Sequence, residues 1–185
     1  MYKSNRIRLR PIEESDAPLI AEMRSDFEDV RAYIGRPFPN HVEGEREWIR
    51  GLYQKGFPTS IAMVVEELES KAFIGFVVAS QIHWVHRTAA YGVFLHRNAR
   101  GKGYFREAQI LFFAYLFREL NLRKLNSSII PYNQVAIKVT TSLGFKQDGL
   151  RKEQIFQNGK YYDEMTISLM ASDFFASNPV DEIVV

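Results

Sequence analysis

The segment from residue 89 to residue 130 constrains the fold more than any other part of the chain. It reads as a strand (89–95), a glycine-containing turn, a helix that begins after Gly103, and a second strand (125–130). A strand, a helix and a strand in succession are typical of a parallel crossover unit, because parallel strands need a long connection. Ligands tend to bind at the carboxyl ends of such strands. We therefore predict an α/β protein with a ligand site near the turn.

Further strands and helices are expected on both sides of this unit. Alternating apolar side chains predict a strand at the start of the chain, and helical spacing predicts two helices after it. A short helix is predicted after Pro131, and the wide apolar face of the helix after Gly103 predicts that it packs between other elements. The predicted strands are 7–12, 59–66, 73–81, 89–95, 125–130, 145–156 and 161–170. Together these elements predict a mixed sheet of about six to seven strands, flanked by about four helices.

Local signals mark where several elements begin and end. Asn40 and Glu43 have the spacing of a capping box at the start of the second helix. The dipeptide Asn158-Gly159 is a favoured hairpin turn between the last two strands. After Phe175 the composition is mixed and predicts a frayed end.

Composition narrows the classes of protein. The 185 residues are 46% hydrophobic, which predicts one globular domain at 1–176 with a tail at 177–185. The longest apolar run is eight residues, Ile110 to Phe117, against roughly 20 for a membrane span. No apolar stretch follows the first residues, so we expect no signal peptide and a cytoplasmic location. The chain has no cysteine, which excludes disulfides, thiolate metal ligands and a cysteinyl intermediate.

Charge is segregated along the chain. Residues 70–147 contain eleven lysines and arginines against only Glu107 and Glu119, whereas the flanks carry an excess of acids. A basic centre favours an anionic ligand, and acidic flanks favour a cationic one. The alternative is a surface charge distribution without function.

The turn after residue 95 carries the most specific chemistry. Gly101 and Gly103 allow a ligand to approach the backbone, and the following helix start offers free N–H groups to an anion. Four basic residues surround them: Arg97, Arg100, Lys102 and Arg106. A phosphate or pyrophosphate cradle is one interpretation, and a tight turn with solvated bases is the other. His96 occupies the first glycine position of a Walker loop, and Arg106 the third glycine position of a dinucleotide fingerprint, so neither of those loops fits.

These residues resemble the acetyl-CoA pyrophosphate loop of the GNAT superfamily of N-acetyltransferases, whose pattern is Gln/Arg-x-x-Gly-x-Gly/Ala. Both glycines match, and Asn98 departs from the first position. Downstream, Asn133-Gln-Val-Ala136, Leu143-Gly144-Phe145 and Gly149 resemble the helix and strand signature of the same superfamily. The hairpin Asn158 to Asp163 resembles the branch containing ribosomal-protein and spermidine acetyltransferases. The resemblance covers about residues 6 to 175.

The resemblance implies acetyl-CoA as the co-substrate and roles for particular residues. Val93, Phe94 and Leu95 would offer backbone groups to the pantetheine arm and the thioester oxygen. Asn133 would bond to the pantetheine arm, although an ordinary helix N-cap is the alternative. The pyrophosphate would be held by Arg100, Gly101, Lys102, Gly103, Tyr104 and Phe105.

Two positions at which relatives carry catalytic side chains do not match. Many relatives have a tyrosine seven residues after the asparagine, where this chain has Thr140, and a glutamate where it has Ala90. A base or a water chain is still required, because a primary amine with a pKa near 10.4 is almost fully protonated at pH 7. The base candidates are His83, His86 and Glu153. A surface or packing role is the alternative for the two histidines, and no metal is expected at them.

The expected activity is direct transfer of an acetyl group from acetyl-CoA to a primary amine of a polyamine, a protein N-terminus or an amino sugar. Asp26, Glu28 and Asp29 would attract a cationic acceptor, unless they form only a solvated helix end. An acyl-CoA-binding sensor without catalysis is the alternative function. A nucleic acid is not expected as a partner, because the aromatic residues of the basic segment read as core. A membrane is not expected either, because the longest apolar run is too short to span one. The chain is expected to be a monomer or a homodimer.

Overall fold

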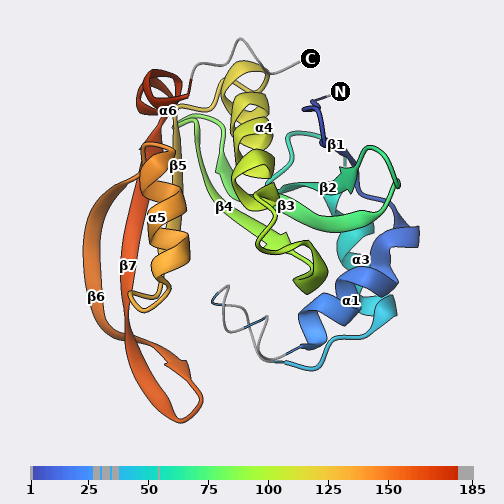
Figure 1. Ribbon diagram of the computed structural model, residues 1–185, viewed down its shortest axis with the longest axis horizontal. Helices are drawn as coiled ribbons and strands as arrows, with labels where there is room; N and C mark the ends of the chain where they lie inside the picture. Colours follow the sequence, from blue (N-terminus) through green and yellow to red (C-terminus); the bar gives the residue numbers. More distant parts are fainter. Residues whose placement is uncertain (1, 27–29, 31–33, 35–37, 54, 179–185) are drawn as a thin grey trace.

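The computed structural model describes residues 2–26, 30, 34, 38–53 and 55–178. Their strands form one seven-stranded sheet in the order β1-β2-β3-β4-β5-β7-β6 (Figure 1). The strands are β1 Ile7–Pro11, β2 Ile61–Glu67, β3 Phe73–His83, β4 Thr88–Leu95, β5 Lys124–Ile129, β6 Lys146–Gln157 and β7 Lys160–Met170. The helices are α1 Ala17–Ser25, α3 Val42–Leu52, α4 Tyr104–Arg118, α5 Gln134–Ser142 and α6 Ala171–Ser177, with short 3-10 turns η1 Glu14–Asp16 and η2 Arg97–Ala99. The predicted fold class is confirmed.

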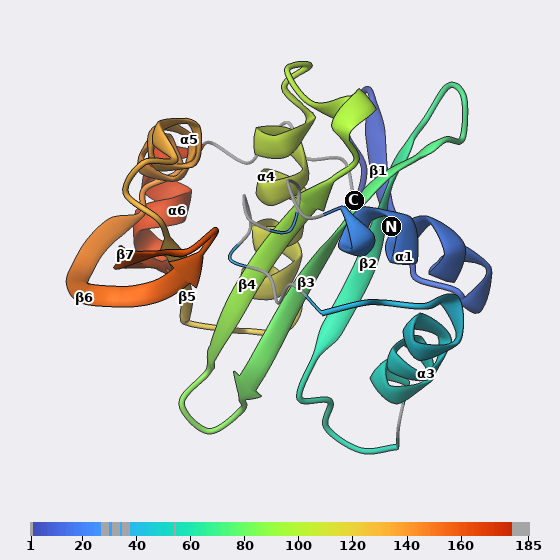
Figure 2. The same ribbon diagram turned by 90° about the horizontal axis from the view of Figure 1, so that it is seen from below.

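Helices cover both faces of the sheet. On one face α4, α5 and α6 lie over a large core, and on the other α1 and α3 lie over β2 and β3 (Figure 2). Helix α4 buries side chains all around its axis, including Phe112 and Phe113, as its wide apolar face predicted. No helix among the described residues has the length and hydropathy that crossing a membrane requires.

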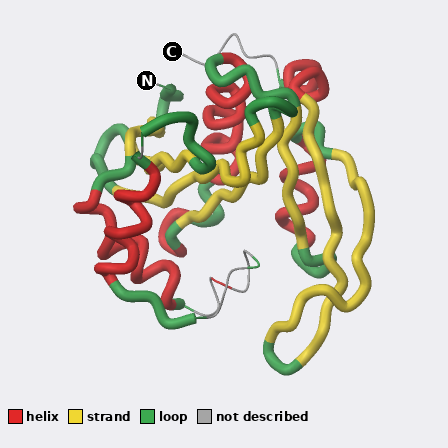
Figure 3. The backbone as a smooth tube through the Cα atoms, turned by 180° about the vertical axis from the view of Figure 1, so that it is seen from behind, coloured by secondary structure: helices red, strands yellow, loops and turns green. Residues whose placement is uncertain are grey.

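The pairing of strands follows the sequence patterns closely. β4 and β5 are parallel, so the predicted parallel crossover is confirmed, and β2, β3 and β4 are antiparallel neighbours. Asn158 and Gly159 adopt φ values of 50° and 76°, as a two-residue hairpin turn between antiparallel strands requires. Figure 3 shows the resulting β6–β7 hairpin extending beyond the rest of the sheet.

The predicted cap of the second helix was wrong. Helix α3 is capped by His41, whose Nδ1 accepts the N–H of Gly44 at 3.0 Å. The Asn40 amide instead donates to the backbone carbonyl of Arg24 at 3.0 Å. Helix α6 continues past Phe175 to Ser177, and Phe174 in that helix is fully buried against α4. Residues 179–185, in which the frayed end was predicted, lie outside the described residues.

The parallel pairing at the centre of the sheet is short. β4 and β5 pair only where Thr88 to Ala90 face Lys124 to Asn126. Beyond that point β4 continues beside β3, whereas β5 continues beside β7. The two strands therefore diverge, and we call the place where they part, after Ala90 and Asn126, the fork.

Candidate functional site

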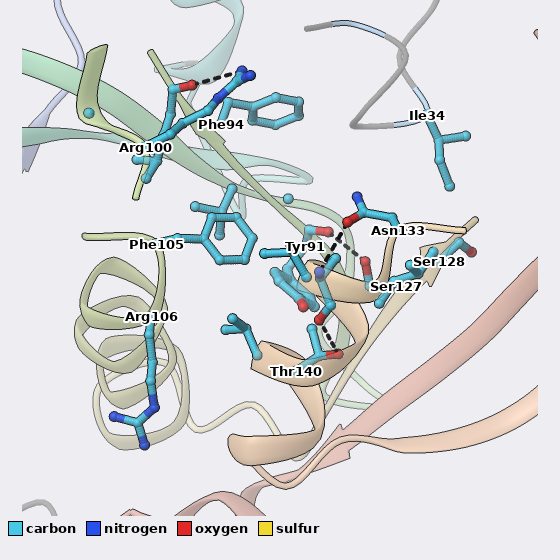
Figure 4. A pocket seen from close by; sticks show the side chains of 18 of the residues that line it. Ile34, Tyr91, Phe94, Arg100, Phe105, Arg106, Ser127, Ser128, Asn133 and Thr140 are labelled. Carbon is cyan, nitrogen blue, oxygen red and sulfur yellow. Dashed lines mark hydrogen bonds between the residues drawn. The ribbon is translucent and has the colours of Figure 1, made fainter. Parts of the chain in front are cut away.

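A cavity of about 420 Å³ lies where β4 and β5 diverge (Figure 4). Its walls come from the two strands, from the turn before α4, and from the facing sides of α4 and α5. We call it the wedge pocket; among its lining residues are Tyr91 to Leu95, Arg100, Gly101, Gly103, Phe105, Arg106, Ser127 to Ile129, Asn133 and Thr140. The lining is largely apolar, with basic side chains at the end formed by the turn.

The turn before α4 has the geometry of an anion cradle. Gly101 and Gly103 have φ values of 73° and 84°, in the left-handed region that glycine adopts without strain. Gly103 is the N-cap of α4, so the free N–H groups of the first helical turn lie next to the pocket. Arg100 donates to the backbone carbonyl of Leu95 at 3.3 Å, and Arg106 also lines the pocket. These features fit a pyrophosphate.

The outer side of this turn is held by Arg6, which directly precedes β1, and by Glu67 of β2. Arg6 donates to the carbonyl oxygen of Lys102 at 2.9 Å and is ion-paired with Glu107 in the first turn of α4. Its guanidinium lies 4.8 Å from the centre of the Tyr104 ring, and the Tyr104 hydroxyl donates to Glu67. The turn is therefore held from outside by side-chain contacts, while its inner side is left for a ligand.

The wedge pocket brings together eight of the ten residues that sequence analysis proposed for cofactor binding. Lys102 and Tyr104 are not among its lining residues, because the side chain of Tyr104 is turned toward Glu67 and the backbone oxygen of Lys102 toward Arg6. The eight are Val93, Phe94, Leu95, Arg100, Gly101, Gly103, Phe105 and Asn133.

Helix α5 and its N-cap supply two polar residues to the pocket. Asn133 is the N-cap of α5, and its Oδ1 accepts the N–H of Ala136 at 3.1 Å. The hydroxyl of Thr140, which is 4% exposed, donates to the carbonyl oxygens of Ala136 and Ile137 at 2.8 and 3.1 Å. Thr140 is thus bonded back to its own helix.

The three base candidates lie apart from the wedge pocket. His83 ends β3 and faces Thr88 across the sheet, and its ring stacks on that of His86 at 4.0 Å. Glu153 lies exposed on β6, where its N–H donates to Asp163 at 3.0 Å. None of the three lines the pocket, so their assignment as the base stays a prediction.

The acidic cluster proposed for the acceptor is only partly described. Asp26 forms an ion pair with Arg97 in η2, directly before the cradle. Glu28 and Asp29 lie outside the described residues. The charge of Asp26 is therefore balanced by a base, and its role toward an acceptor stays a prediction.

A second cavity, of about 560 Å³, opens on the other face of the sheet at the same fork. Ala89 and Leu125 point into the core under α4, so Ala90 and Asn126, the next residue of each strand, point to the opposite face. We call this space the far-face cavity; it is lined by Gln81, Ala90, Asn126, Ser127, Ser128, Asp148, Gly149, Leu150, Arg151, Thr166 and Ile167. Ser127 and Ser128 line both cavities, so the two meet at β5.

Asp148 is the carboxylate of the far-face cavity. The Ser168 hydroxyl donates to it at 2.9 Å and the Lys124 ammonium lies 3.2 Å away; these contacts hold the pKa of Asp148 below its ordinary value. Arg151, also in the lining, is ion-paired with Glu164. Sequence analysis did not find this cavity, because its residues come from strands far apart in the chain. Its local signal is the run of three polar side chains, Asn126, Ser127 and Ser128, in the middle of β5.

Within the part of the chain that is described, no group of three or more acidic or histidine side chains is arranged to hold a metal ion.

Comparisons with known proteins agree with this geometry. Residues 6–146 match the model of the acetyltransferase (GNAT) domain family. The chain is 27% identical to spermidine N(1)-acetyltransferase of Escherichia coli K12, over 96% of this chain and 93% of that protein. It is 24% identical to spermidine N(1)-acetyltransferase of Vibrio cholerae, over 92% and 96% of the two chains. A crystal structure of spermidine N-acetyltransferase from Vibrio cholerae in complex with CoA and spermine superposes with a TM-score of 0.83 at 25% identity, covering 91% of this chain and 98% of that one.

The matched family, the fold and the pocket agree with the resemblance seen in the sequence. They favour catalysis over a sensor that only binds acyl-CoA. The chain belongs to the GNAT acetyltransferase family and is an acetyl-CoA-dependent N-acetyltransferase.

Proposed function

We propose that the chain acetylates a primary amino group of a polyamine such as spermidine, with acetyl-CoA in the wedge pocket and the amine in the far-face cavity. The observation that carries this proposal is the meeting of the two cavities at Ser127 and Ser128. A donor bound on one face of the sheet and an acceptor bound on the other can touch only there. The fork is then the place of acetyl transfer.

For the donor, the pyrophosphate lies against the cradle, where Arg100 and the N–H groups at the start of α4 neutralise its charge. The pantetheine arm runs along Val93 to Leu95, the part of β4 that follows its pairing with β5. The Asn133 side chain lies at the opposite wall. This arrangement directs the thioester toward the fork.

For the acceptor, a cationic amine is supported by Asp148 and by the spermidine acetyltransferases among the relatives. Since the pKa of Asp148 is lowered, it is ionised at neutral pH. Asp148 therefore attracts and orients an ammonium group. The proton of the attacking amine leaves along water that Asn126, Ser128 and Gln81 hold in the same cavity, and it passes to the bulk solvent.

The same proposal includes a cytoplasmic enzyme, monomeric or homodimeric, with neither a nucleic acid nor a membrane as partner. Its one domain comprises residues 1–176, with residues 177–185 as a tail.

The test is acetyl-CoA consumption, followed as free thiol, with spermidine, spermine, a peptide with a basic free N-terminus, glucosamine and the monoamine butylamine. We expect the highest kcat/KM with the polyamines, and we expect it to fall with added salt because screening weakens the attraction to Asp148. Equal kcat/KM for spermidine and butylamine would contradict the proposed acceptor class.

A matched pair of variants tests the cavity. Asp148→Asn removes the charge and keeps the shape, and should raise the KM for spermidine with little change for butylamine. The control, Asp163→Asn, removes a carboxylate on β7 that is paired with Lys152 and does not line the far-face cavity. It should leave the KM for spermidine and the KM for butylamine unchanged. An unchanged spermidine KM in Asp148→Asn would remove Asp148 from the acceptor site.

A further inference from the structure

We propose that the Tyr91 hydroxyl donates a hydrogen bond to the sulfur of acetyl-CoA as the thioester breaks, which makes Tyr91 a catalytic residue. This inference rests on the proposed function, since it requires the thioester at the fork.

Tyr91 is the first residue of β4 beyond the fork, directly after the last residue that pairs with β5. Its side chain points to the α4 face, where its ring packs edge-on against Phe113 at 4.8 Å and lies 5.2 Å from the ring of Phe145. It also lines the wedge pocket together with Thr140 (Figure 4). The ring is therefore held by the core and forms part of the pocket wall.

Four hydroxyl groups line the pocket among the residues that the structure describes, and they differ in what they already bond. The Thr140 hydroxyl donates to its own helix, and the Ser127 hydroxyl donates to the backbone oxygen of Tyr91 at 3.3 Å. Ser128 belongs to the face of β5 that points toward the far-face cavity, since it alternates with Ser127. The remaining hydroxyl is that of Tyr91, which directly follows Ala90 on β4, where β4 and β5 part.

The hydroxyl of Tyr91 is oriented but not tightly bound. It lies 3.4 Å from Oε1 of Gln109, which is longer than a good O–H···O hydrogen bond. Gln109 is fully buried, and its Nε2 donates to the backbone oxygen of Phe105 at 3.1 Å, so its oxygen stays directed at the phenol. A stronger acceptor at the fork can therefore draw the O–H away from Gln109 at little cost.

The leaving sulfur is such an acceptor. The amine nitrogen attacks the carbonyl carbon, the new C–N bond forms, and the C–S bond breaks with its electron pair left on sulfur; the amine proton goes to water in the far-face cavity. Negative charge then develops on sulfur inside a largely apolar pocket, where a hydrogen-bond donor stabilises it more than in water.

Tyr91 donates without losing its proton. Burial raises the pKa of its phenol well above the ordinary value near 10, and a hydrogen bond from the Ser127 side chain, which lowers that pKa, offsets only part of the effect; a free thiol has a pKa of about 8.5. The proton therefore stays on oxygen while the thiolate forms, and the enzyme needs no step that restores it. The effect of the Tyr91 hydroxyl on kcat should therefore be the same at neutral and at mildly basic pH.

The experiment compares the wild-type enzyme with Tyr91→Phe, which keeps the ring and removes the hydroxyl. We expect kcat to fall roughly ten- to a hundredfold, as on removal of other charge-assisted donors. The dissociation constant for acetyl-CoA, measured by calorimetry, and the melting temperature should change little. The control is Tyr115→Phe, a half-buried phenol on α4 whose ring packs on Tyr2 and does not line the pocket; its kcat should equal that of the wild type.

Three results would overturn the assignment. A wild-type kcat in Tyr91→Phe would show that the hydroxyl does not act in the reaction. A parallel loss of acetyl-CoA affinity and melting temperature would show that Tyr91 only packs the pocket wall. An absence of thiol release by the wild type with every amine tested would refute the proposed function itself, and with it the role of Tyr91.

Discussion

Replacement of Gly103 by valine is the most direct test of the anion cradle. Gly103 adopts a φ of 84° as the N-cap of α4, a conformation that a β-branched residue resists. A Cβ at this position would approach Arg6 Nη2 to 3.4 Å, which is ordinary contact. The strain therefore arises in the backbone and not from a collision.

The left-handed conformation costs an L-residue roughly 1–2 kcal/mol. If the turn relaxes to relieve this strain, the N–H groups at the start of α4 lose their alignment on the pyrophosphate. Since 1.4 kcal/mol is a factor of about ten, the dissociation constant for acetyl-CoA should rise roughly 5- to 30-fold. If the turn stays in place, the strain appears instead as a loss of folding stability.

Calorimetric titration with acetyl-CoA and urea unfolding of the free enzyme separate these two outcomes. Gly56→Val is the matched control, because Gly56 has a φ of 103° and open space around it, between α3 and β2. The control should lose stability and keep its affinity for acetyl-CoA. If Gly103→Val binds acetyl-CoA as tightly as Gly56→Val does and is also as stable as the wild type, the strain has been relieved without a loss of binding, and the turn is not the pyrophosphate site.

Three further changes are predicted from the same contacts. Thr140→Val should keep kcat within about threefold in steady-state assays, because its hydroxyl is bonded to its own helix; a hundredfold loss would place that hydroxyl in the reaction. Arg6→Met should weaken acetyl-CoA binding in calorimetry, because Arg6 holds the carbonyl of Lys102, and unchanged affinity would show that the turn needs no outside support. Burial raises the pKa of Glu66, but hydrogen bonds from Arg10 and Arg8 outweigh it and hold that pKa below the ordinary value. The ionised carboxylate therefore stabilises the fold above about pH 4.3, and this stabilisation is lost as the pH falls. In urea unfolding, the wild type should be more stable than Glu66→Gln at pH 7, and this difference should shrink toward pH 3. A difference that stays constant with pH would contradict the ion pairs of Glu66.

The sequence predicted those parts of the protein that depend on neighbouring residues. Strands and helices follow local periodicity, and the hairpin turn follows from Asn158-Gly159. The cradle could be predicted for the same reason, since its two left-handed glycines and the start of α4 lie within a few residues of one another. The predicted N-cap of α3 was wrong by one residue, because Asn40 and His41 can both cap a helix. The Asn40 side chain instead forms a hydrogen bond with the carbonyl of Arg24, which is distant in sequence.

What only the tertiary structure decided is where distant segments meet. The fork exists because β4 stays paired with β3 and β5 with β7, and no local pattern states how many residues of a parallel pair stay together. The far-face cavity likewise joins β5, β6 and β7 around Asp148, and the fold also brings the phenol of Tyr91 on β4 to within 3.4 Å of Gln109 on α4. His83 and His86 could be proposed from their chemistry, but the sheet register places them beside Thr88, before the fork. Residue type and local spacing determine which elements and turns can form, whereas strand order and register, which depend on contacts across the whole chain, determine which side chains share a site.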